Sequence, residues 1–176
     1  MERWVAPVIV PAVPRLVLAC LLCVLLAAPA SAAVALRSGT SGPDRLVGGA
    51  RGDRIDGGAG DDVILGRAGA DRLIGDGGDD HISGGSGDDV IAGDAGNDRI
   101  SGGRGADLLL GGSGADRISA ATPDGALDVV VAGAGDDTVS ARDGARDRIS
   151  CGPGFDRVRA DVRDTVGRDC EQVSRG

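Results

Sequence analysis

The sequence contains no lysine and no tyrosine, and its only phenylalanine and tryptophan are Phe155 and Trp4. Aromatic side chains supply much of the buried area of a wide globular core, so their scarcity argues against an ordinary enzyme fold. All 19 basic residues are arginine, and the 27 acidic residues outnumber them to give a formal net charge of -8. Because binding to phosphates needs a positive face, this balance argues against nucleic acid as a partner and favours a cation.

Residues 1–32 have the pattern of a secretory signal. Two arginines supply positive charge, and residues 16–28 form an apolar run that is too short to span a bilayer comfortably. Small residues follow, and we place the cut after Ala32, with a cut two residues earlier or three later as alternatives. Lipoprotein processing at Cys20 and an uncleaved anchor are the rival interpretations. The segment predicts a secreted, extracellular protein with no membrane span after cleavage.

The cysteine count predicts one disulfide. Cleavage of the signal would remove Cys20 and Cys23 and leave Cys151 and Cys170. An even number of cysteines in an oxidising compartment favours a bridge, which would close a loop of about 20 residues and stabilise the fold by roughly 3 kcal/mol. A metal site is the alternative, but two thiols with no nearby histidine make a poor one.

Residues 39–119 consist of nine consecutive blocks of nine residues without an insertion. Glycine occupies the first position of every block and the fourth position of all but one, where Arg51 replaces it. The eighth position is leucine or isoleucine throughout. A block with one inward apolar side chain cannot bury it alone, so the strict period indicates a stack of similar units. The sixth position is aspartate in every block, namely Asp44, Asp53, Asp62, Asp71, Asp80, Asp89, Asp98, Asp107 and Asp116.

Each recurring position has a physical reason. Glycine tolerates positive φ, so the first six residues of a block can form a tight turn in which backbone carbonyls converge. The last three residues, with the apolar residue in the middle, predict a three-residue strand whose middle side chain points inward.

The pattern GGxGxDxUx, in which U is a large apolar residue, resembles the RTX, or hemolysin-type, calcium-binding repeats. The resemblance implies an all-β parallel β-roll, a β-solenoid in which two nonapeptides make one turn and calcium ions lie between neighbouring loops on the same side. It also implies that the sixth-position aspartate supplies a carboxylate and that loop carbonyls supply most other ligands, with up to seven sites in all. One edge would hold Asp44, Asp62, Asp80, Asp98 and Asp116, and the other Asp53, Asp71, Asp89 and Asp107.

The spacing of these aspartates favours a cation for a separate, electrostatic reason. Adjacent turns of a parallel stack lie about 4.8 Å apart. Carboxylates at that distance repel by roughly 1 kcal/mol in water and by about 3–4 kcal/mol at an effective dielectric constant of 20. Summed along two edges, this repulsion rivals the stability of a small domain, and a hard divalent cation removes it. We therefore expect the metal-free chain to be largely unfolded, with calcium binding and folding as one event.

The repeat becomes irregular toward the C-terminus. The predicted β-roll spans residues 33–159, and thirteen blocks would make about six and a half turns. Within residues 120–159 two of the four blocks are longer and have alanine at the fourth position, so we expect the strands to continue but the calcium sites to be weak or missing. Residues 160–176 break the repeat and are expected to form a C-terminal cap pinned by the disulfide. The aspartates in register in the irregular blocks are Asp128, Asp137, Asp147 and Asp156.

Several outward positions of the even-numbered blocks, from the fourth block onward, are aliphatic. Ile74, Val90, Leu108 and Leu110 would lie on adjacent turns and form an exposed apolar patch, a feature that often marks an interface. We therefore expect this face to contact a protein partner or another copy of the chain.

No nucleophile motif, zinc signature or phosphate-binding loop appears outside the repeats, so the chain is predicted not to be an enzyme. The favoured function is that of a secreted calcium-binding repeat protein. The alternative is a structural or adhesive protein of the cell surface that uses calcium only for stability.

Overall fold

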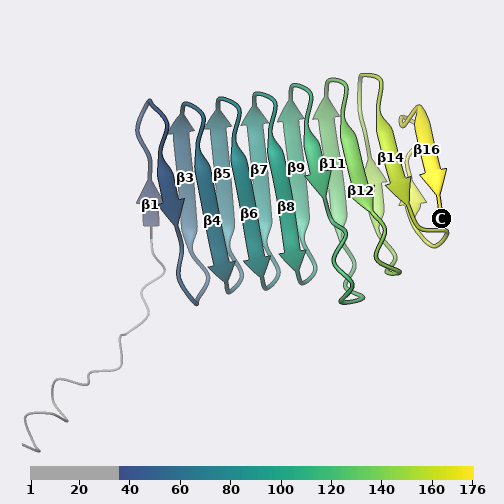
Figure 1. The fold of residues 1–176 in the computed structure, drawn as a ribbon, viewed down its shortest axis with the longest axis horizontal. Helices are drawn as coiled ribbons and strands as arrows, with labels where there is room; N and C mark the ends of the chain where they lie inside the picture. The colour runs from purple at the N-terminus through teal and green to yellow at the C-terminus, as the bar shows by residue number, and fades with distance from the viewer. Residues whose placement is uncertain (1–35) are drawn as a thin grey trace, which may run out of the picture. The chain divides into compact units, whose positions relative to one another are not determined.

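The structure, a computed structural model, describes residues 36–176, which form a coil with two parallel β-sheets of eight strands each (Figure 1). The predicted signal, residues 1–32, lies outside the described residues. No helix within residues 36–176 has the length and hydropathy that crossing a membrane requires. One sheet contains, in spatial order, β1 (Leu36–Ser38), β3 (Arg54–Ala59), β5 (Arg72–Gly77), β7 (Val90–Ala95), β9 (Leu108–Ser113), β11 (Val129–Ala134), β13 (Arg148–Ser150) and β15 (Thr165–Val166). The other contains β2 (Arg45–Val47), β4 (Val63–Ala68), β6 (His81–Ser86), β8 (Arg99–Arg104), β10 (Arg117–Ser119), β12 (Thr138–Ala141), β14 (Arg157–Ala160) and β16 (Gln172–Arg175).

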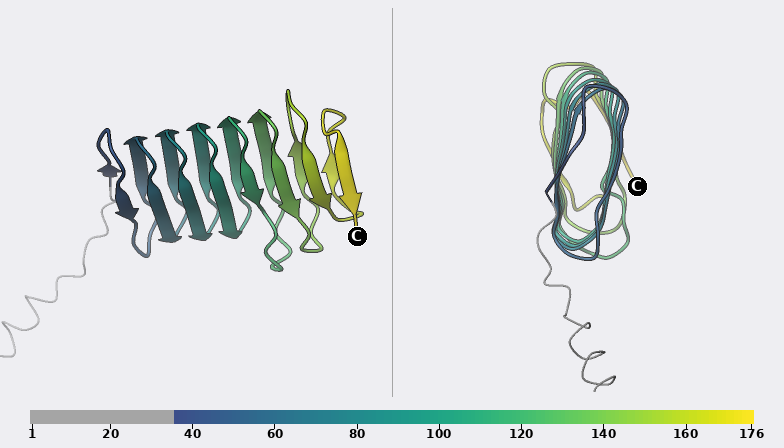
Figure 2. Two further views of the ribbon diagram at one scale, coloured as in Figure 1. Left: turned by 45° about the horizontal axis from the view of Figure 1, so that its top comes forward. Right: turned by 90° about the vertical axis from the view of Figure 1, so that its left-hand side faces the viewer.

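The coil advances by two nonapeptides in each turn. Consecutive strands belong to opposite sheets, and hydrogen-bonded neighbours within a sheet are two strands apart in the sequence. Leu73 in β5 pairs with Ile55 in β3 and with Ile91 in β7, so each partner is 18 residues away. Seen end-on, the turns superpose as a flattened loop (Figure 2). The all-β parallel solenoid that the repeats predicted is confirmed.

One aliphatic side chain from each strand between β3 and β14 fills the narrow interior. The eighth-position residues from Ile55 to Ile118 are at most 3 % exposed. In the later turns valine and isoleucine continue this column, joined by fully buried alanines such as Ala132 and Ala141. Because the two sheets are separated by one layer of such side chains, the core needs no aromatic residue, and Phe155 lies exposed at the surface.

Seven of the nine strands of the regular blocks, β3 to β9, are longer than the three residues that the sequence predicted, whereas β2 and β10 have three. β4, for example, spans Val63–Ala68 and so includes the first three residues of the following block. The residue at the second position has a positive φ, 92° at Gly58 and 71° at Asp76, which bends the chain. These two residues nevertheless remain paired with each other between β3 and β5. Only the fourth to sixth positions are left to form each loop, which holds the sixth-position aspartate directly before a strand.

The C-terminal region continues the coil. Strands persist through the irregular blocks as β11 to β14, as expected. The prediction of six and a half turns was short because β1, β15 and β16 lie outside the thirteen blocks, and the last two pair in parallel with β13 and β14. The predicted bridge between Cys151 and Cys170 is confirmed, with a Cα–Cα distance of 5.2 Å. It fastens the tail to the preceding turn at the end of the stack.

The sheet that contains β5, β7 and β9 has an aliphatic outer surface, which we call the aliphatic face. Parallel pairing places Val90 beside Leu108, and β11 extends the face by one more strand. Most of its side chains are half-buried, and Val131 is 41 % exposed. The aliphatic face consists of Ile74, Val90, Ala92, Leu108, Leu110, Val129 and Val131.

Candidate metal centres

The sixth-position aspartates form two ladders, one along each edge of the coil. Within a ladder, the Oδ1 atom of each aspartate accepts a hydrogen bond from the backbone N–H of the aspartate one turn earlier, at 2.7–2.9 Å. Asp98 Oδ1, for example, accepts from the N–H of Asp80 at 2.8 Å. The membership is the one that the sequence predicted, with Asp44, Asp62, Asp80, Asp98 and Asp116 in one ladder and Asp53, Asp71, Asp89 and Asp107 in the other.

The second carboxylate oxygen of most ladder members is buried without a hydrogen-bond partner among the described residues. These side chains are at most 2 % exposed. Burial of a charged oxygen is costly unless something compensates for the lost water, so two rows of such oxygens require protons or a positive ligand. The Oδ2 atoms concerned in the regular blocks belong to Asp62, Asp71, Asp80, Asp89, Asp98, Asp107 and Asp116.

The first-position glycines bring backbone carbonyl oxygens to the same places. A β-carbon on Gly75 would lie 2.7 Å from the carbonyl oxygen of Gly93, one turn later, and closer still to Asp80 Oδ2. Only glycine lets these two oxygens pack so close to its Cα, so each such glycine brings together a carboxylate and a carbonyl oxygen, the ligand types that a hard cation such as Ca²⁺ prefers. The equivalent pair of oxygens surrounds the same point at Gly57, Gly66, Gly84 and Gly93.

Burial and mutual repulsion raise the pKa values of the central ladder aspartates. Desolvation raises the pKa of Asp89 to about 7, and the charges of Asp107 and Asp71 add to this effect. Desolvation likewise raises the pKa of Asp116 to about 7 and that of Asp80 to about 6. The N–H bond to Oδ1 lowers each of these pKa values but does not offset burial. The metal-free ladders therefore cannot be fully charged at neutral pH, whereas a bound divalent cation would favour the charged form.

The first aspartate of each ladder differs from the rest. Asp44 Oδ2 accepts hydrogen bonds from the backbone N–H of Thr40 at 2.6 Å and from the Thr40 hydroxyl at 2.9 Å. Asp53 Oδ2 accepts from the N–H of Gly49 at 2.6 Å. The nine aspartates predicted as ligands thus separate into seven whose Oδ2 is open to a cation and two whose Oδ2 is already bonded within its own loop.

Both ladders continue into the irregular turns. The sequence placed four of the later members in register but missed the final ones, Asp164 and Glu171. A signal for them exists, because each stands two residues before an apolar strand residue, Val166 and Val173, as the regular aspartates do. One ladder runs from Asp107 through Asp128 and Asp147 to Asp164, and the other from Asp116 through Asp137 and Asp156 to Glu171.

The first-position glycine is replaced in these later turns, although the carbonyl oxygen of Ala132 still approaches Gly111 as a glycine carbonyl does in the regular blocks. Ala132 stands five residues before Asp137, and Cys151 five residues before Asp156, where the regular blocks have glycine. Their β-carbons take the space that a first-position glycine leaves open. Weak or missing sites of the regular kind therefore remain our prediction for these turns.

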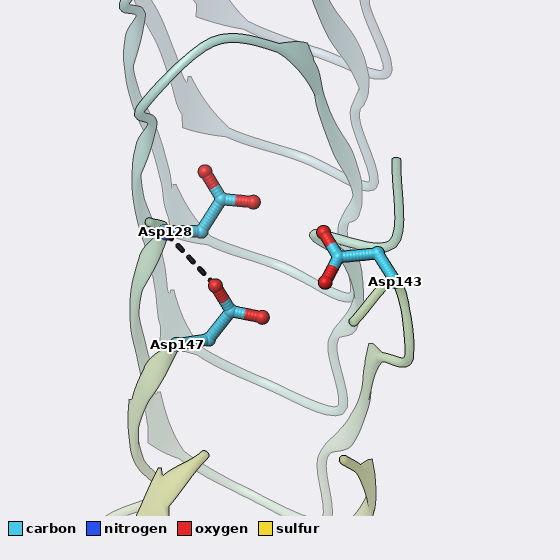
Figure 3. A group of neighbouring side chains, drawn as sticks. All are labelled: Asp128, Asp143 and Asp147. Atoms are coloured by element: carbon cyan, nitrogen blue, oxygen red, sulfur yellow. Dashed lines mark hydrogen bonds between the residues drawn. The ribbon is translucent and has the colours of Figure 1, made fainter. Parts of the chain in front are cut away.

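A third carboxylate approaches one ladder at a single place. Asp143, in the loop between β12 and β13, brings a carboxylate oxygen to within 4.8 Å of oxygens of Asp128 and Asp147. Asp128 and Asp147 stack along the same edge, and the Asp143 carboxylate faces them from the opposite side (Figure 3). Sequence reasoning did not single out Asp143, because it belongs to a ten-residue block and occupies no recurring acidic position.

Comparison with known families supports the geometry. The RTX calcium-binding nonapeptide repeat matches the chain in four copies, at residues 38–73, 65–100, 92–121 and 124–158. A comparison with curated proteins gave no match. The four matched segments cover more than half of the chain and include all nine ladder aspartates of the regular blocks. The stacked glycine loops and aspartate ladders are therefore RTX calcium-binding repeats, and the chain belongs to that family.

Proposed function

We propose that the chain is a secreted calcium-binding protein whose regular blocks hold up to seven calcium ions between successive turns. The observation that carries this proposal is the double row of buried Oδ2 atoms without hydrogen-bond partners among the described residues, which lie close to glycine carbonyl oxygens of the neighbouring turn. Seven ladder aspartates have such an oxygen. Of the seven pairs of successive aspartates along the two edges, five join two of these aspartates, and the other two pairs begin with Asp44 or Asp53. Affinities of about 10⁻⁴–10⁻³ M would be ordinary for an extracellular calcium module.

We also propose that calcium binding and folding are a single event. Without a cation, the folded state must bury two rows of carboxylates or keep them protonated, and the raised pKa values of Asp89 and Asp116 express that cost. The unfolded chain exposes the same groups to water and carries no such cost. A cation that binds only the stacked turns therefore shifts the equilibrium toward the fold.

Titration calorimetry of the purified chain with calcium chloride tests both proposals. We expect several ions per chain, with the heat of folding appearing in the same transition. Uptake of no calcium at millimolar concentration would overturn the first proposal. Calcium uptake with the secondary structure already complete beforehand would overturn only the second.

Secretion is the third part of the proposal. The disulfide between Cys151 and Cys170 is consistent with an oxidising compartment. We propose that residues 1–32 direct export and are then removed, so that exported material begins at Ala33. Mass spectrometry of protein from the culture medium tests this, and an intact N-terminus on exported protein would contradict it.

A structural or adhesive role is a second candidate function, favoured by the aliphatic face. In this case the face contacts another copy of the chain, and calcium only maintains the scaffold. Sedimentation with calcium should show association that the double substitution Leu108→Ser and Leu110→Ser reduces. The same change at Val63 and Leu65, on the opposite sheet, is the matched control. A monomer at all concentrations would exclude self-association.

The prediction that the chain is not an enzyme stays a prediction.

A further inference from the structure

The group Asp128, Asp143 and Asp147 lies in the irregular turns, where the sequence predicted weak or missing calcium sites. Asp128 and Asp147 immediately precede β11 and β13, are each 1 % exposed and belong to the same ladder. Asp143 is half-buried and comes from the loop before β13. One carboxylate oxygen from each of the three residues lies within 4.8 Å of the other two (Figure 3).

One oxygen of each of these carboxylates accepts a hydrogen bond from a backbone N–H. Asp128 Oδ1 accepts the N–H of Asp107 at 2.8 Å, and Asp147 Oδ1 accepts the N–H of Asp128 at 2.9 Å. Asp143 Oδ1 accepts the N–H of Ala145 at 2.8 Å. The Oδ2 atoms of Asp143 and Asp147 are buried and have no hydrogen-bond partner among the described residues. Asp147, almost wholly buried, thus directs an unpartnered oxygen into a group with two other acids.

The tail of the chain fixes the loop that carries Asp143. The N–H groups of Asp143 and Gly144 both donate to Asp161 Oδ2, at 2.8 Å and 2.6 Å. Gly144 adopts a φ of 89°, which lets the loop turn back toward the ladder. Arg175 donates to the backbone carbonyl oxygens of Asp161, at 2.9 Å, and of Asp164. The third carboxylate is therefore held in position by contacts beyond the ten-residue block itself.

This arrangement differs in composition from the regular sites. A regular site has carboxylates from two successive turns and carbonyl oxygens from the glycine loops. Here a third carboxylate takes part, and the block of Asp147 begins with Ala141 in place of glycine. More ligand charge strengthens calcium binding. Three carboxylates with no compensating cation also repel more strongly than two.

We infer that Asp128, Asp143 and Asp147 form an additional site for a hard divalent cation such as Ca²⁺, with the three carboxylates as ligands and higher affinity than the regular sites. The site consists of oxygen atoms of these three residues, none of which belongs to a regular block, and the folded coil brings them together. It goes beyond the proposed function, which assigns ions only to residues 39–119. The site lies next to the tail, whose Asp161 accepts the N–H groups of Asp143 and Gly144.

Calcium calorimetry of the full chain and of Asp143→Asn tests the inference. Asparagine keeps an Oδ1 acceptor for the N–H of Ala145 but removes the charge. Asp136→Asn is the matched control, because Asp136 is an exposed loop residue whose Oδ1 accepts the N–H of Phe155 at 3.0 Å. We expect Asp143→Asn alone to lose one high-affinity ion or weaken it at least tenfold. Isotherms for the two variants that coincide in stoichiometry and affinity would overturn the inference.

A measurement on the unsubstituted chain covers the case in which Asp143→Asn fails to fold. Stepwise removal of calcium from the loaded chain with a chelator should change the amide NMR signals of residues 57–98 before those of Asp143 and Gly144, because the tighter site loses its ion last. The opposite order would contradict the inference. If the coil folded although the regular blocks bound no calcium, the unsubstituted chain would take up one ion and Asp143→Asn none, so failure of the proposed function is distinguishable from failure of this site.

Discussion

Each ladder aspartate has two different functions for its two oxygens. Oδ1 is part of the fold, because it accepts a backbone N–H from the preceding turn and so supplements the parallel sheets. Oδ2 is buried, has no such partner in the regular blocks from Asp62 onward, and lies beside a glycine carbonyl oxygen. A substitution can therefore remove the charge and keep the structural hydrogen bond.

Asp89→Asn tests this separation of functions. Asparagine can still accept the N–H of Asp71, but it provides no charge to the cation spaces on either side of it. We expect the calcium concentration at the folding midpoint to rise by roughly tenfold, equivalent to about 1.4 kcal/mol. Asp88→Asn is the control, because Asp88 is exposed and its Oδ1 also accepts a backbone N–H, that of Ala106. Equal shifts for the two variants in circular dichroism titrations would contradict the assignment.

Gly93→Ala tests the role of the first-position glycine. The added β-carbon would lie 2.6 Å from the carbonyl oxygen of Gly111 and would also clash with Asp98 Oδ2. We expect a loss of about 1–3 kcal/mol from the free energy of unfolding in calcium, typical of overpacking. Gly77→Ala is the control, since nothing lies within 4 Å of its β-carbon position, and it should change stability by less than about 1 kcal/mol. Similar urea denaturation midpoints for the two variants would count against a space reserved for oxygens.

At the scale of the strand, the nine-residue period predicted a stack of similar units, and the resemblance to the RTX repeats implied its two edges and the pairing of residues 18 apart, such as Leu73 with Ile91. It could not predict that strands extend through glycines of positive φ, because parallel pairing across neighbouring turns sustains them. It also could not place Asp143, whose approach to the ladder depends on contacts between a ten-residue block and the tail. Where a block departs from nine residues, tertiary contacts determine the positions of its side chains, and a repeat pattern does not contain those contacts.

The disulfide belongs to the last strands. The bridge between Cys151 and Cys170 ties the segment before β16 to the segment after β13. Replacement of both cysteines by serine should lower the free energy of unfolding in calcium by about 3 kcal/mol, because the unfolded chain regains the freedom of a loop of about 20 residues. Calcium-dependent urea denaturation of both proteins measures this. An unchanged midpoint would mean that the tail is held by its strand pairing alone.

At the scale of the whole molecule, the two ladders make stability depend on whatever neutralises them. Protons, like calcium, neutralise the ladder carboxylates. Desolvation raises the folded-state pKa of Asp89, Asp116 and Asp128 to about 7 and that of Asp107 to about 6, against an ordinary value of 3.8. Between pH 4 and 7 the metal-free fold therefore binds more protons than the unfolded chain does, and its stability falls as the pH rises.

Because the stability of the metal-free fold falls as the pH rises, the structure of the metal-free chain should depend on pH. In calcium-free buffer, stabilisation by protons is fully present below about pH 4 and is lost as the pH rises through 6 to 7. Acidification from pH 7.5 to 4.5 should therefore increase β-structure in the metal-free chain, measured by circular dichroism. In contrast, calcium affinity should fall over the same range, because protons compete for the same oxygens. A metal-free chain that loses structure on acidification would contradict the raised pKa values.

The most direct test of the account is the far-ultraviolet circular dichroism of the purified chain at neutral pH, first in excess chelator and then with millimolar calcium. The account predicts a largely unfolded spectrum that changes to a β-sheet spectrum as calcium is added. A complete β-sheet spectrum in chelator, unchanged by calcium, would contradict the claim that divalent cations between the turns hold the aspartate ladders together.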